Sequence, residues 1–223
     1  MKNKIAIVSG ANGNLGRAVV QYFLAQKWLV IGLEHQLSNL IKEENFQEIA
    51  VNLLDEKATA DCVQNIIANY GRIDVLVHTV GGFAMGNIAD TSTQDIFKQY
   101  QLNFETTYNL VRPILAKMHE QKSGDLFFIG SLAGKDTSNG KGVTAYSLSK
   151  SLLFQLAKLI DVESKGTLIQ THVVVPSIID TPQNRAAMPN ADFSKWEKPE
   201  LIAKIIGQYL GLEKQVIVVQ DEK

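Results

Sequence analysis

The sequence predicts an α/β protein built on a doubly wound, seven-stranded parallel sheet with helices on both faces. Short apolar, β-branched segments alternate with longer segments of helical periodicity along the whole 223-residue chain, and this order favours a parallel sheet. Several short segments, such as Ile5–Val8 and Val173–Val175, are apolar without alternation, as strands covered on both faces are. Right-handed crossovers then place helices on each side of the sheet.

The elements follow one another without an internal repeat or a Pro/Gly-rich linker, so we expect a single domain over residues 1–223. The strands expected from their apolar content are Ile5–Ser9, Leu29–Leu33, Ile49–Leu53, Val75–Thr79, Leu126–Ile129, Thr171–Val175 and Val216–Val219. The helices expected from their periodicity are Leu15–Gln26, Glu56–Tyr70, Thr93–Gln121, Tyr146–Glu163 and Pro199–Leu210. The ligand crevice of such a sheet lies beyond the carboxyl ends of the strands, so the residues that follow each strand are candidates for a site.

Composition argues against several classes of function. Lys and Arg total 22 against 23 Asp and Glu, so no basic excess is present for nucleic acid or for an anionic membrane surface. Cys62 is the single cysteine, which rules out an intrachain disulfide and a cysteine-based metal site, and the four histidines are scattered. No apolar stretch approaches the length of a membrane span. We therefore expect a soluble cytoplasmic protein that binds no metal and acts on a small molecule.

A glycine-rich turn follows the first expected strand. Gly10, Gly13 and Gly16 are three residues apart at the junction with the first helix. Glycines at such a junction allow a tight turn and a close approach of the backbone to a pyrophosphate, and the helix N-terminus offers free N–H groups to it. The sequence thus predicts dinucleotide binding, with contacts from Gly10, Asn12, Gly13, Asn14, Leu15 and Gly16.

An acidic residue ends the second expected strand. A carboxylate at the position of Glu34 can accept hydrogen bonds from the adenosine ribose hydroxyls and would repel a 2′-phosphate. No Arg or Lys stands next to Glu34, and His35 is its only neighbouring candidate for a cation. This pattern favours NAD(H) over NADP(H), which stays the alternative.

A tyrosine and a lysine stand four residues apart at the start of the helix after the fifth expected strand. Tyr146 and Lys150 share one face of that helix. A neighbouring ammonium favours the phenolate, so we expect Lys150 to lower the pKa of Tyr146 and to fit it for proton transfer to a carbonyl oxygen. Ser131 follows the fifth strand, where its hydroxyl can hold a substrate oxygen beside Tyr146.

In this order along the chain, the motifs resemble those of the short-chain dehydrogenase/reductase family. Ser9-Gly10-x-x-Gly13-x-x-Gly16 is similar to its cofactor turn, Tyr146-x-x-x-Lys150 to its catalytic pair, and Ser131 to its catalytic serine. The resemblance covers essentially the whole chain and implies a Rossmann-like domain, a nicotinamide cofactor and hydride transfer. It also implies a proton-relay role for Asn103, a second role for Lys150 as an anchor of the cofactor ribose, and cofactor contacts from Asn52, Leu53, Val80, Gly81, Tyr146, Lys150, Pro176, Ile179 and Thr181.

Several positions depart from the usual pattern of the family. Where the family has Asn-Asn-Ala-Gly after strand four, this chain has His78-Thr79-Val80-Gly81, and Ser177 replaces a glycine. The stretch from Asp180 to Trp196, together with Val80-Gly81-Gly82-Phe83, is similar to the dihydropteridine reductase branch. That branch reduces quinonoid dihydropterins with NADH but has Ala where this chain has Ser131. A lone histidine such as His78 is more typical of a hydrogen-bonded structural residue than of a proton carrier.

The segment at residues 182–198 lies where a substrate lid is expected, between the sixth strand and the next helix. We expect substrate contacts from Gly82, Phe83, Met188, Phe193 and Trp196, although the lid aromatics fit equally well a role in packing the lid onto the body. Apolar faces on the helices over 93–121 and 146–163 indicate a homodimer or a homotetramer.

Three functions stay open from the sequence. The first is a carbonyl or alcohol oxidoreductase, favoured by Ser131; the second is a dihydropteridine reductase, favoured by the Asp180–Trp196 segment. The third is a non-catalytic dinucleotide sensor, against which the presence of Tyr146 and Lys150 weighs.

Overall fold

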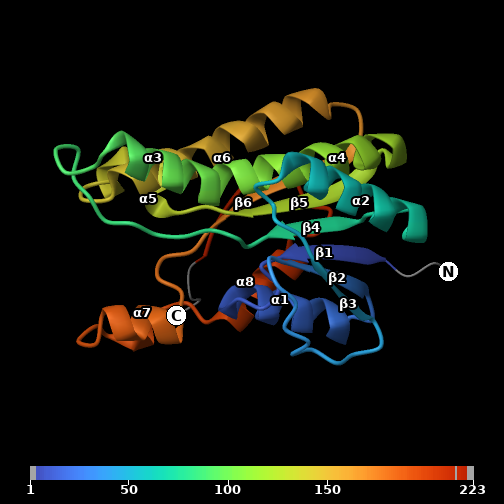
Figure 1. The fold of residues 1–223 in the computed structure, drawn as a ribbon, viewed down its shortest axis with the longest axis horizontal. Coiled ribbons are helices and arrows are strands. Elements are labelled where there is room, and N and C mark those ends of the chain that lie inside the picture. Colours follow the sequence, from blue (N-terminus) through green and yellow to red (C-terminus); the bar gives the residue numbers. More distant parts are fainter. Residues whose placement is uncertain (1–3, 214, 220–223) are drawn as a thin grey trace.

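The computed structural model describes residues 4–213 and 215–219, and seven parallel strands form its central sheet in the order β3-β2-β1-β4-β5-β6-β7 (Figure 1). The predicted seven-stranded parallel sheet with flanking helices is therefore confirmed. The strands are β1 (Ile5–Ser9), β2 (Leu29–Glu34), β3 (Phe46–Ala50), β4 (Val75–His78), β5 (Ser123–Ile129), β6 (Leu168–Val175) and β7 (Val216–Val218).

The strand order reverses at β1, which pairs with β2 on one side and with β4 on the other. Ser9, the last residue of β1, is in register with Leu33 of β2 and with His78 of β4. The chain leaves these strands in opposite directions, which opens a crevice at their carboxyl ends.

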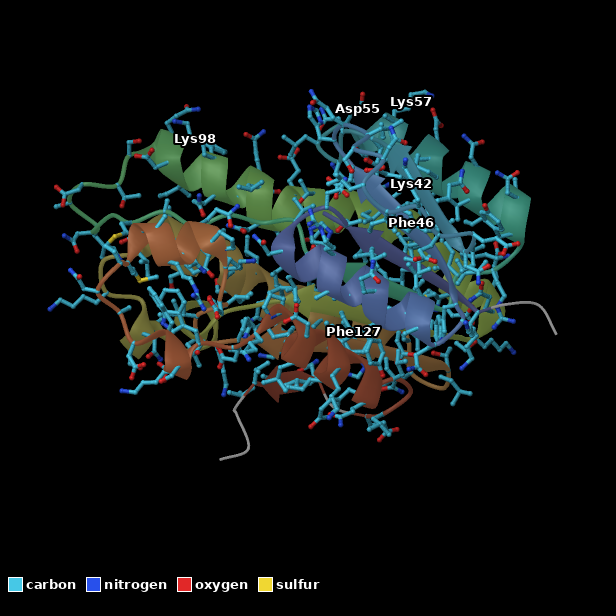
Figure 2. All side chains as sticks on the ribbon, turned by 90° about the horizontal axis from the view of Figure 1, so that it is seen from below. Lys42, Phe46, Asp55, Lys57, Lys98 and Phe127 are labelled. Carbon is cyan, nitrogen blue, oxygen red and sulfur yellow. The ribbon has the colours of Figure 1, made fainter. Side chains whose placement is uncertain are left out.

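Helices cover both faces of the sheet, each over its own apolar core (Figure 1). On one face α1 (Asn14–Ala25) and α8 (Pro199–Gln208) run side by side (Figure 2). The other face carries α2 (Glu56–Tyr70), α4 (Thr106–Gln121) and α6 (Thr144–Glu163). Shorter helices follow the strand ends: α3 (Thr93–Tyr100), α5 (Leu132–Lys135), α7 (Pro182–Ala187) and the single turns Thr137–Asn139 and Phe193–Lys195.

The third strand lies earlier in the chain than the sequence predicts. We expected Ile49–Leu53, whereas β3 spans Phe46–Ala50. β3 is an edge strand, half exposed along its length, so it lacks the continuous apolar run of the central strands. Val51 and Leu53 are buried after the strand has ended, and their apolar side chains led to the misplacement.

The helix expected over Thr93–Gln121 is divided. α3 and α4 are joined by a π-helical turn at Gln101–Glu105, which contains Asn103. Such turns occur often at functional sites because the extra residue re-aims neighbouring side chains.

No helix in the described part of the chain is long and apolar enough to cross a membrane. Within the same residues, no three His, Cys, Asp or Glu side chains are grouped so as to hold a metal ion. The single-domain boundary at 1–223 stays a prediction, and residues 1–3, 214 and 220–223 of that range lie outside the described part.

Candidate active site

The glycine turn after β1 leaves no room for side chains. Gly10 has a φ of +67°, and a Cβ there would lie 2.9 Å from the Thr79 hydroxyl. A Cβ on Gly16 would lie 1.9 Å from the carbonyl oxygen of Gly10, so the first turn of α1 packs directly on the loop before it. These two positions explain why the turn requires glycine.

The N-terminus of α1 is open toward the crevice. Gly13 is the N-cap residue, no side chain caps the helix, and no acidic residue stands in its first turn. The first N–H groups of a helix lack intrahelical partners and, with the helix dipole, favour an anion. The side chain of Leu15 is buried in the core, so any cofactor contact from this residue comes from its main chain.

Glu34 ends β2 beside this turn, and its carboxylate accepts a hydrogen bond from the main-chain N–H of Asn12. Burial raises the pKa of Glu34, the bond from Asn12 partly offsets this, and the charge of Glu48 raises it further. Asn12 Oδ1 is buried and has no hydrogen-bond partner. The glycine turn thus has a carboxylate and a buried amide oxygen beside it, which are both hydrogen-bond acceptors.

Ser131 and Tyr146 meet at the other end of the crevice, where their side chains are hydrogen-bonded to each other. Ser131 is the N-cap of α5, and its Oγ accepts the N–H of Gly134 at 3.0 Å. The long spacing between the two residues therefore does not separate them, because α5 and the turn after it absorb the additional residues.

Burial raises the pKa of Tyr146, and the hydrogen bond with Ser131 offsets only part of that rise. Loss of solvation of the phenolate sets the direction of this shift, and Lys150 is not among the groups that change the pKa of Tyr146, so the expected lowering by its ammonium is not found. Lys150 is 6 % exposed, and burial lowers the pKa of its ammonium to about 8. Its Nζ donates to the carbonyl oxygen of Ile129 at 2.8 Å.

Asn103, in the π-helical turn, is fully buried, and its side-chain amide binds the main chain of the loop after β4. Its Oδ1 accepts the N–H of Gly82 at 2.9 Å, and its Nδ2 lies 3.0 Å from the carbonyl oxygen of Gly82. A Cβ on Gly81 would lie 2.7 Å from Asn103 Oδ1 and 3.1 Å from Lys150 Nζ, so both groups approach the loop at one point. Gln99 and Ser149, which the sequence did not single out, accept from Asn103 Nδ2 at 2.9 and 3.1 Å.

His78 lies at the centre of the site as a buried, neutral side chain. Ser9 Oγ lies 2.8 Å from Nδ1, and Thr106 Oγ1 lies 3.3 Å from Nε2. Burial lowers the pKa of His78 to about 3, and the charge of Lys150 adds to this. Such a ring stays uncharged near neutral pH. Its contacts with Ser9 and Thr106 connect β4 to β1 and to α4.

The predicted substrate residues fall into two groups. Phe83 is 62 % exposed and meets the ring of Tyr146 edge to face at a centroid distance of 5.0 Å, next to Gly82. Met188 is 37 % exposed, whereas Trp196 is buried and packs on Phe193 at 4.7 Å. The burial of Trp196 favours the packing alternative for the lid aromatics.

The segment predicted as a lid, residues 182–198, is held by polar side chains within it and just before it. Arg185 donates two hydrogen bonds to Asp180, at 2.6 and 2.7 Å, and its guanidinium lies 4.7 Å from the ring centre of Phe193. Thr181 caps α7 by accepting the N–H of Asn184, whose Nδ2 donates to the carbonyl oxygen of Ile179 at 2.8 Å. At the base of the lid, Ser177 donates to the buried carboxylate of Glu197, a partner that the sequence did not reveal.

The remaining predicted cofactor residues follow their strands. Asn52 lies in the turn between β3 and α2, where its Oδ1 accepts the N–H of Leu54. Leu53 is buried, and its carbonyl oxygen accepts from Asn109 at 2.9 Å. Val80 lies against the glycine turn, and Pro176 is buried directly after β6. Their contact with a cofactor stays a prediction.

The profile of the short chain dehydrogenases matches residues 4–192, most of the sequence. The chain belongs to the short chain dehydrogenase family. Its relatives include the 3-oxoacyl-[acyl-carrier-protein] reductase FabG of Thermotoga maritima, 22 % identical over 98 % of this chain and 99 % of that protein. The acetoacetyl-CoA reductase of an Acinetobacter species is 27 % identical over 81 % of this chain and 76 % of its own.

Solved structures share the fold of this short chain dehydrogenase. ElxO with NADP bound superposes with a TM-score of 0.87 at 22 % identity, over 98 % of this chain and 97 % of that one. The family binds NAD(P)(H), and the uncapped helix N-terminus and the glycine turn fit such a dinucleotide.

Proposed function

We propose that this short chain dehydrogenase is an NADH-preferring reductase of small carbonyl compounds in which Tyr146 is the proton donor. The observation that carries the proposal is the hydrogen bond between Ser131 and Tyr146, with the ammonium of Lys150 buried on the same helix. Two hydroxyls that converge in this way are suited to bind one carbonyl oxygen. When bound, the nicotinamide cofactor supplies the hydride.

Each side chain has a separate task in this mechanism. The Oγ of Ser131 accepts the N–H of Gly134, and its O–H, which interacts with Tyr146 in the structure, would donate to the substrate oxygen once that oxygen lies between the two hydroxyls. The Tyr146 O–H donates the proton to that oxygen, and the Lys150 ammonium on the same helix face would add positive charge near the phenolate that forms. Asn103 holds the loop at Gly82 in place through both atoms of its amide.

The preference for NADH follows from Glu34. Its carboxylate lies at the ribose end of the crevice and would repel a 2′-phosphate. The relatives that reduce 3-oxoacyl and acetoacetyl groups support a carbonyl substrate. The exposed ring of Phe83 beside Tyr146 is suited to cover an apolar part of it.

Reduction of a quinonoid dihydropterin is the second candidate, favoured by the sequence of the lid. Arg185 and Asn184, the lid side chains suited to a polar ring edge, already bind Asp180 and Ile179. This makes the pterin the less favoured of the two substrates.

The test is NADH oxidation by the purified chain with acetoacetyl esters, cyclic ketones and a quinonoid dihydropterin, in parallel with Tyr146→Phe. We expect turnover with carbonyl compounds, its loss in Tyr146→Phe, and unchanged NADH binding by fluorescence titration in that variant. Turnover with the pterin alone would replace the first candidate by the second. Full turnover by Tyr146→Phe with every substrate would refute the role of the phenol.

A further inference from the structure

A second carboxylate lies beside Glu34 at the ribose end of the crevice. Glu48 is the third residue of the edge strand β3, in register with Gly32, two residues before Glu34 on β2. Its Oε1 accepts from the side-chain amide of Asn12, the same residue whose main-chain N–H binds Glu34. The glycine turn therefore brings two carboxylates together on Asn12.

The two carboxylates differ in how they are held. The charge of Glu48 contributes to raising the pKa of Glu34. Hydrogen bonds from Asn12, Ser38 and Asn39 together outweigh partial burial and lower the pKa of Glu48. Glu48 therefore keeps its charge at neutral pH, whatever the ionisation of its neighbour.

Glu48 also orders the chain that follows β2. Its Oε1 accepts the N–H and the hydroxyl of Ser38 at 3.0 and 3.1 Å, and its Oε2 accepts the N–H of Asn39 at 2.9 Å. Asn39 has a φ of +54°, in the left-handed region, which asparagine adopts more readily than most residues. The chain then runs from this turn to β3 past Lys42 and Phe46, which are both labelled in Figure 2. One carboxylate thus closes the turn beside the ribose position and adds a negative charge there.

We propose that Glu48 is a second determinant of cofactor selectivity, which acts with Glu34 to exclude the 2′-phosphate of NADP(H). The proposal rests on the NADH preference proposed above and deepens it. With two carboxylates at this position, neutralising Glu34 alone leaves a repulsive charge in place. Full tolerance of a 2′-phosphate requires both substitutions.

The test measures NADH and NADPH affinities by fluorescence titration for the parent, Glu34→Gln, Glu48→Gln and the double variant. Glutamine removes the charge and keeps one acceptor oxygen, so in Glu48→Gln the bonds to Ser38 can persist while the bond from the Asn39 N–H is lost. We expect each single variant to bind NADPH about fivefold more tightly, and the double variant to exceed either, since a phosphate of charge near −2 interacts with each carboxylate. NADH affinity is expected to change less than about twofold in Glu48→Gln, and its gain for NADPH is expected to shrink as salt is raised.

Two controls separate charge from loop order. Ser38→Ala removes one bond to Glu48 and leaves the charge, and Glu44→Gln removes an exposed charge from the segment before β3. NADPH binding is expected to stay within about twofold of the parent in both, because neither changes the charge at the ribose end. If Ser38→Ala reproduces Glu48→Gln, or if Glu48→Gln leaves NADPH binding unchanged while the parent prefers NADH, Glu48 is no determinant. A parent chain that prefers NADPH would instead overturn the preference assigned to Glu34.

Discussion

Acidification is expected to destabilise the fold through His78. This residue is 2 % exposed, and its two ring nitrogens lie within hydrogen-bonding distance of the Ser9 and Thr106 hydroxyls. Burial first, and then the charge of Lys150, lower its pKa to about 3, whereas an unfolded histidine titrates near about 6.5. The imidazolium would have to be buried next to an ammonium.

The sign of the effect follows from which state binds the proton. Below about pH 6.5 the unfolded chain takes up a proton at His78, whereas the folded chain does so only near about pH 3. The free energy of unfolding therefore falls as the pH is lowered through this window, and above it the residue has no effect. At about pH 5 this single group is expected to remove about 2 kcal/mol of stability.

Urea unfolding at about pH 8 and about pH 5 measures this loss, with His78→Asn as the matched variant. Asparagine supplies a donor and an acceptor without a titratable charge, so other acid-sensitive groups contribute equally to both chains. We expect the parent to lose about 2 kcal/mol more than the variant between the two pH values. Equal losses in both chains would refute the assignment of a buried, neutral imidazole.

Three further predictions concern the crevice and its lid. Gly16→Ala would place a Cβ 1.9 Å from the Gly10 carbonyl oxygen, so we expect it to cost more than about 2 kcal/mol in unfolding experiments and to abolish NADH binding. Gly13→Ala, at 3.1 Å from the same oxygen, is the milder control, and equal losses would contradict the packing argument. Because the pKa of Lys150 is about 8, kcat/KM for carbonyl reduction is expected to fall above about pH 8. Lys150→Arg is expected to move this fall in kcat/KM to higher pH. A fall at the same pH in the variant would show that the ionisation of Lys150 does not cause it. Arg185→Gln breaks the ion pair of the lid and is expected to raise KM about threefold with kcat nearly unchanged, whereas a fall in kcat alone would place Arg185 in the chemistry.

The central strands and the glycine turn could be predicted because their signals are local. An unbroken apolar run such as Ile5–Val8 marks a strand buried on both faces, and Gly10 and Gly16 mark positions where a Cβ would meet backbone or a neighbouring side chain. The contact of Ser131 with Tyr146 follows from the order of strand, turn and helix, because α5 takes up the additional residues between them.

The edge of the sheet could not be predicted in the same way. β3 is half exposed, so its pattern is weaker than that of Val51 and Leu53, which follow it and are buried for other reasons. The misplacement by three residues left Glu48 outside the expected strand and hid its position beside Asn12. The π-helical turn at Asn103 was missed because its apolar spacing resembles that of the flanking helices.

The direction of the Tyr146 pKa shift could not be predicted from the spacing of Tyr146 and Lys150 in the sequence. An interval of four residues places Tyr146 and Lys150 on one helix face, but the effect of an ammonium on a phenol also depends on the solvation of both. In the structure burial raises the pKa of the phenol and lowers that of the ammonium, so each pKa is shifted toward the neutral form. A phenol in this state keeps its proton until a substrate oxygen accepts it, and the hydrogen bond with Ser131 is the interaction that lowers its pKa. The proposed carbonyl reduction requires a protonated phenol, which is the form of Tyr146 that this burial favours.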